Sequence, residues 1–234
     1  MQPFGQPLDK AALQQHIYAT YNTLRFGMVV IAFAFPILLY LVGAIHGIAL
    51  QDSMSAYYWA EAGCEVPARV WFVGGLFAIG SFLYLYKGFT VGENYALNAA
   101  ALFVIGVAYF PMEWGCGTAC AKVSAHGVCA VLMFVCLAYV AWFRSGDTLP
   151  WLGNADRETH YRGWYRVASV VMLVSPLTAV LLQSVFQKSG AYVYFIELAG
   201  IWAFSLYWLI KSLEMRESQA EKRALQAPCD VEYA

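Results

Sequence analysis

Charged residues are scarce in this sequence. Only 12% of its 234 residues are Asp, Glu, Lys or Arg, against about 25% in an ordinary soluble domain, and 61% are hydrophobic. This balance argues against water as the main solvent and favours a membrane protein. The formal net charge of −1 provides no basic surface for nucleic acid, so we expect no nucleic-acid partner.

Three other patterns are missing as well. No segment alternates strictly between apolar and polar residues, which argues against a β-barrel. The first 24 residues include Asp9, Lys10 and His16 and are too polar for the apolar core of a signal peptide, so we expect the first membrane span to be retained. No internal repeat is visible, so the half-repeats typical of many transporters are not indicated.

Apolar residues instead gather in six runs of the length that a bilayer requires, because a hydrocarbon core about 30 Å thick needs roughly 20 helical residues. We therefore predict a single all-α polytopic membrane domain, a bundle of about six transmembrane helices. The predicted spans are 26–50, 70–86, 95–112, 123–143, 167–186 and 191–212. Residues 1–25 would form a cytoplasmic N-terminal segment, residues 26–213 the transmembrane domain and residues 214–234 a cytoplasmic tail.

The distribution of Lys and Arg between alternate loops predicts the orientation, because cation-rich loops remain in the cytoplasm. Eleven of the 14 cations would lie on one side: Lys10, Arg25, Lys87, Arg144, Arg157, Arg162, Arg166, Lys211, Arg216, Lys222 and Arg223. Only Arg69, Lys122 and Lys188 would lie on the other. We expect both termini in the cytoplasm, a plasma or inner membrane as the location, and membrane lipid as a partner. The sequence does not define the oligomeric state.

Ionisable residues at membrane depth fall mainly in the outer half of the predicted bundle. The candidate ligand or metal residues there are His46, Asp52, Ser55, Glu113, His126 and Glu197. Glu197 lies about two turns inside the sixth span, where a charge is costly unless it is paired, hydrated or turned inward. We expect it to approach His126 inside the bundle, either as a hydrogen-bonded lock or as a ligand, proton or metal site. Asp52 is better placed to cap a short outer helix.

Three cysteines lie in the predicted outer loops. If the outer side is oxidising, a disulfide from Cys64 to Cys116 or Cys120 is expected, and it would tie the first outer loop over the second. The alternative is a metal pocket that combines Cys116 and Cys120 with His126.

One segment of the sequence resembles a known membrane family. Residues 51–58 (Gln-Asp-Ser-Met-Ser-Ala-Tyr-Tyr), followed by 66–69 (Val-Pro-Ala-Arg) and 73–76 (Val-Gly-Gly-Leu), resemble the outer loop and second span of DRAM-like six-span proteins. The resemblance is confined to this loop and span. It implies a lipid-related or regulatory role in a membrane rather than a defined catalytic set.

A second partial resemblance concerns intramembrane zinc hydrolases. Asp52, Ser55, His46 and His126 lie on the side where the superfamily of alkaline ceramidases and progestin receptors places its Ser, Asp and His residues, but the last two predicted spans contain no His. Glu197 would have to replace the missing pair. The resemblance then implies a Zn²⁺ ion held by two His and a carboxylate, which would activate a water molecule.

Four functions remain open on these grounds, and the sequence does not decide whether the protein is an enzyme. The first is an outer cavity that binds a lipid or another small ligand without chemistry. The second is a metal-dependent intramembrane hydrolase. The third is a small transporter or channel, which requires polar groups that continue into the cytoplasmic half, where the sequence indicates only Asn98 and Ser81. The fourth is a haem protein that uses His46 and His126.

Overall fold

Six long α-helices make up most of the described part of the protein. The computed structural model describes residues 9–116, 124–184, 190–220 and 223. The helices are α1 (Lys10–Ile45), α2 (Pro67–Leu85), α3 (Val91–Tyr109), α4 (Ala125–Tyr139), α5 (Ala155–Ser184) and α6 (Ala191–Ser218), and the short segments are η1 (Ser55–Tyr58), η3 (Val140–Arg144) and η4 (Ser145–Leu152). Among these residues, six helical stretches are long and apolar enough to cross a membrane, so the predicted all-α six-helix bundle is confirmed.

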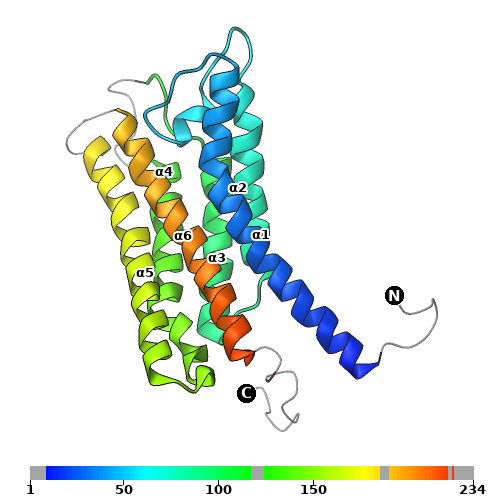
Figure 1. The fold of residues 1–234 in the computed structure, drawn as a ribbon. Coiled ribbons are helices and arrows are strands. Elements are labelled where there is room, and N and C mark those ends of the chain that lie inside the picture. The colour runs from blue at the N-terminus through cyan, green and yellow to red at the C-terminus, as the bar shows by residue number, and fades with distance from the viewer. Residues whose placement is uncertain (1–8, 117–123, 185–189, 221–222, 224–234) are drawn as a thin grey trace.

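The helices form a closed ring. Each long helix packs against the next one along the chain, and α6 returns to pack against α1. Figure 1 shows that α1 begins and α6 ends at the same end of the bundle. We call this the tail end, and we call the opposite end, which carries residues 46–66 and 110–116, the loop end.

Local signals in the sequence set where several helices begin. Pro67 occupies the first turn of α2, where its missing N–H costs nothing. The Thr90 side chain accepts a hydrogen bond from the Glu93 N–H at the start of α3, and Ser124 does the same for the Gly127 N–H at the start of α4. The Ser124 cap lies at the loop end, beside the loops that build the site, whereas the Thr90 cap lies at the tail end.

Helices α1 and α5 begin earlier than the predicted spans. A helix requires backbone hydrogen bonds rather than apolar side chains, so it continues through polar residues that a hydropathy criterion leaves out. In Figure 1 the first part of α1 projects beyond the rest of the bundle at the tail end. Both helices therefore extend beyond the predicted spans at this end.

The outward faces of the helices are apolar. On α5 the exposed large side chains include Val167, Val170, Leu173, Val174, Leu177 and Leu181. A soluble protein rarely exposes a continuous apolar surface of this kind, whereas a membrane helix requires it. The interior between the helices is filled by apolar side chains, among them the fully buried Leu39, Leu83, Leu97, Met172 and Trp208.

Candidate functional site at the loop end

The first long loop folds back over the loop end of the bundle. Its centre is the single turn η1 (Ser55–Tyr58). The Ala56 N–H donates to Ser53 Oγ at 3.2 Å, so Ser53 accepts the hydrogen bond that was predicted for a capping Asp52. The Asp52 side chain is exposed to the surroundings. We refer to residues 51–60 as the plug segment.

Helix α6 and the chain after α3 hold the plug segment in place. The Met54 N–H donates to Glu197 Oε2 at 2.7 Å, and the Tyr194 N–H donates to the Asp52 carbonyl at 3.0 Å. Trp59 Nε1–H donates to the Met112 carbonyl at 2.8 Å. The partly buried Glu197 carboxylate therefore acts as an acceptor for a backbone N–H that the irregular loop does not satisfy itself.

His126 binds the same segment and has a defined tautomer. Its Nδ1 lies 2.8 Å from the Phe110 carbonyl and 3.1 Å from the Val107 carbonyl. A carbonyl only accepts, so Nδ1 carries the hydrogen, and in the neutral ring Nε2 accepts the hydrogen bond from Ser55 Oγ at 2.8 Å. The Val107 carbonyl is available because Pro111, four residues on, has no N–H with which to continue α3.

The structure thus brings two predicted residues, Glu197 and His126, onto one segment. They bind the consecutive residues Met54 and Ser55. The other candidates lie elsewhere on this end: His46 is exposed and bonds the carbonyl of Val42 in its own helix, and Asp52 and Glu113 are exposed as well.

The described part of the chain contains no set of ligands for the predicted metal ion. Among those residues, no group of three or more His, Cys, Asp and Glu lies close enough to hold a metal ion. Both ring nitrogens of His126 are also engaged by protein atoms. The predicted partner Cys120 lies outside the described residues.

The predicted disulfide from Cys64 to Cys116 or Cys120 is wrong, because Cys64 is a free, exposed cysteine. A tight turn explains its position. Ala62 and Glu65 exchange backbone hydrogen bonds of 2.8 and 3.2 Å, and Gly63 adopts a φ of 65°, which leaves Cys64 at the exposed tip of the turn. The plug segment is therefore fastened by hydrogen bonds rather than by a cross-link through Cys64.

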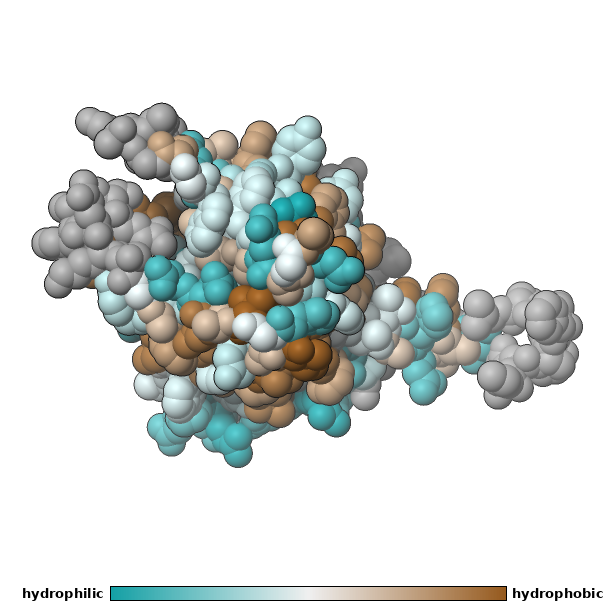
Figure 2. Space-filling view, turned by 90° about the horizontal axis from the view of Figure 1, so that it is seen from above, coloured by the Kyte–Doolittle hydropathy of each residue, from teal (hydrophilic) through white to brown (hydrophobic). Residues whose placement is uncertain are grey.

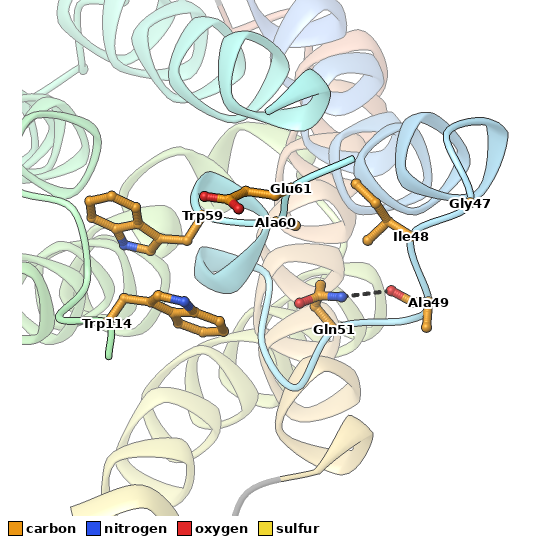
Figure 3. A pocket seen from close by; sticks show the side chains of 8 residues that line it. All are labelled: Gly47, Ile48, Ala49, Gln51, Trp59, Ala60, Glu61 and Trp114. Carbon is orange, nitrogen blue, oxygen red and sulfur yellow. Dashed lines mark hydrogen bonds between the residues drawn. The ribbon is translucent and has the colours of Figure 1, made fainter. Parts of the chain in front are cut away.

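A pocket of about 470 Å³ opens beside the plug segment. It is lined by Gly47, Ile48, Ala49, Gln51, Trp59, Ala60, Glu61 and Trp114. Figure 3 shows the rings of Trp59 and Trp114 on one side of the pocket, one above the other, with Ile48 and Ala49 on the opposite side. The Gln51 amide is held by a 2.8 Å hydrogen bond to the Ala49 carbonyl. Glu61 is the one residue with a formal charge in this lining.

Aromatic side chains at this end already interact with a cation. The Arg69 guanidinium lies 4.6 Å from the centre of the Tyr58 ring and 5.4 Å from that of Trp59, while Arg69 Nε donates to the Tyr58 carbonyl at 2.9 Å. The preceding residue, Tyr57, is fully buried, and burial raises the pKa of its phenol, so its hydroxyl stays neutral. Figure 2 looks down on this end and shows hydrophilic and hydrophobic residues mixed on its surface.

A second polar cluster, which was not predicted from the sequence, lies in the tail-end half. Arg25, Glu93, Lys211 and Glu214 are buried there, each with no more than 2% of its surface exposed. Lys211 Nζ lies 2.8 Å from Glu214 Oε2 and 2.6 Å from the hydroxyl of Thr148. In the sequence, Arg25 and Lys211 count only as cations near the cytoplasmic ends of spans, because a hydropathy pattern does not show which way a residue near a helix end points. The spacing of Lys211 and Glu214 by three residues was the available signal.

The ring of six apolar helices with polar residues turned inward defines a multi-pass α-helical membrane protein. Compared with known proteins, the chain matches no family model, no curated protein and no solved structure. The resemblance to DRAM-like proteins therefore stays a prediction.

Proposed function

We infer that the loop end faces the outside of a plasma or inner membrane and binds a lipid headgroup or small ligand that carries an ammonium group. The observation that carries this proposal is the pocket lined on one side by Trp59 and Trp114. Tryptophan offers the best aromatic face for a cation, and a nearby carboxylate supplies the opposite charge. Glu61 is the carboxylate of this lining.

The pocket has the features of a site open to a headgroup. It lies at one end of the apolar bundle, where lipid headgroups would surround it, and half of the Trp114 side chain is exposed. Trp59 is held by its bond to Met112, so its ring is already fixed before a ligand enters. A fixed ring loses little freedom on binding, which favours affinity.

Binding is tested with choline as the probe, on protein in nanodiscs of phosphatidylglycerol, with tryptophan fluorescence as the signal. We expect saturable quenching, and Glu61→Gln and Trp114→Ala should each weaken the affinity by about tenfold, since a cation–π or charge contact contributes roughly 1–2 kcal/mol when partly desolvated. The matched control is Glu65→Gln, because Glu65 is exposed on the same loop and does not line the pocket.

A second arm distinguishes free ligand from lipid. If the headgroup of a lipid fills the pocket, phosphatidylcholine added to the nanodisc should raise the choline concentration needed for half-saturation. If choline binds equally well in both nanodiscs, the ligand is a soluble ammonium compound. Fluorescence that does not change with choline in phosphatidylglycerol nanodiscs would contradict the proposal.

The proposed orientation predicts that the Cys64 thiol reacts from outside the cell. Cys64 is exposed at the loop end, so a membrane-impermeant maleimide should label it in intact cells. The Cys64→Ala variant corrects for the other thiols. If Cys64 reacts only after the membrane has been opened, the loop end faces inward and the argument from cation distribution fails.

A further inference from the structure

We propose that Ser55 and His126 form a metal-free nucleophile and general-base pair that cleaves an acyl ester at the loop end. This goes beyond the proposed ligand binding and does not depend on it. The proposal rests on the hydrogen bonds of His126, which leave the lone pair of Nε2 directed at the Ser55 hydroxyl, 2.8 Å away.

Hydrogen bonds at the other ring nitrogen, Nδ1, fix the orientation of the imidazole. In a serine nucleophile system a third group holds the Nδ1–H, so that Nε2 faces the hydroxyl in its basic form. Here the carbonyls of Phe110 and Val107 accept the hydrogen bond from Nδ1–H, at 2.8 and 3.1 Å. His126 is 8% exposed, so its ring is shielded, whereas Ser55 is partly exposed and stands in the loop at the surface of this end.

The reaction balances without an ion or a redox partner. Ser55 Oγ forms a bond to the ester carbonyl carbon, its proton passes to His126 Nε2, and the π electrons move to the carbonyl oxygen. As the carbonyl re-forms, the bond to the alcohol oxygen breaks, and that oxygen takes the proton from Nε2, leaving an acyl-Ser55. Water then attacks the acyl group in the same way, giving its proton to Nε2, and the Ser55 oxygen leaves and recovers that proton.

The hydrogen bonds also position the pair within a rigid frame. His126 lies in the first turn of α4, and its two carbonyl partners end α3. Ser55 is held in turn by the bond of the neighbouring Met54 N–H to Glu197. Three separate helices therefore fix the distance between Ser55 Oγ and His126 Nε2. Such a short, fixed distance is needed for a histidine to activate a serine.

The test uses a fluorophosphonate probe, which reacts with activated serine hydroxyls, on the purified full-length protein in nanodiscs. Mass mapping should place the adduct on Ser55 and not on Ser53 in the same segment. The reaction rate should rise with pH as the imidazole loses its proton. His126→Asn keeps an N–H donor for the Phe110 carbonyl but removes the base, so the rate should fall at least about 100-fold.

Controls separate this role from a structural one. His46→Asn changes an exposed histidine at the same end and should label at the rate of the unmodified protein. A structural hydrogen bond alone would give no adduct on Ser55, and that result overturns the proposal. So would an adduct on Ser55 whose rate is the same in His126→Asn and in the parent. Mapping the adduct in the parent protein keeps the test decisive even if a variant fails to fold.

Discussion

Replacement of Lys211 by Met is expected to destabilise the protein by about 3–5 kcal/mol, because it leaves the carboxylate of Glu214 buried without its cation. Lys211 and Glu214 are 1% and 0% exposed, and their charged atoms lie 2.8 Å apart. The Met side chain fills nearly the same volume, so the loss reports the charge rather than a cavity. The measurement is the free energy of unfolding in mixed micelles with increasing SDS, followed by circular dichroism.

Two further variants make the result specific. Adding Glu214→Gln to Lys211→Met should restore much of the loss, because Gln keeps an oxygen for the 3.0 Å hydrogen bond from Tyr165 and carries no charge. The control is Arg157→Ala, which breaks an exposed ion pair with Glu217 at 2.9 Å and should cost less than about 1 kcal/mol. If Lys211→Met behaves like Arg157→Ala, the buried pair is not required for stability.

Glu197→Leu is expected to loosen the plug segment. The Met54 N–H would lose its acceptor, and an unsatisfied buried group costs about 1–3 kcal/mol, which corresponds to an increase of roughly 5- to 150-fold in local opening. The measurement is amide hydrogen exchange in residues 52–60, with the amides of α3 as an internal reference. Faster exchange should be confined to the plug segment.

The matched variant is Glu197→Gln. Its side-chain carbonyl still accepts the hydrogen bond from Met54, so exchange in the plug segment should stay close to that of the unmodified protein. Equal exchange in the Leu variant and the unmodified protein would mean that Glu197 does not anchor the segment. Fast exchange in both variants would show that the carboxylate charge, rather than the acceptor, is needed.

The sequence by itself predicted the fold class correctly. Long apolar runs separated by polar loops are almost sufficient to predict a helical bundle, because in a bilayer every backbone group of a span must form its hydrogen bond within its own helix. Local contacts of the same kind set two helix starts: Ser124 and Thr90 each accept a hydrogen bond from the N–H three residues on. Glu197 and His126 were also identified, since polar residues inside apolar runs stand out against their neighbours.

Tertiary structure decided what those residues contact. Glu197 and Met54 are 143 positions apart, and Ser55 and His126 are 71 apart, so no local pattern relates either pair. The predicted bond to Cys64 failed for the same reason, because the turn at Gly63 turns that thiol outward. The burial of the charged residues at the tail end could not be predicted from the sequence either. Whether Lys211, near a helix end, points to the interior depends on how α6 packs against η4 and α5. That packing is set by the whole ring of helices.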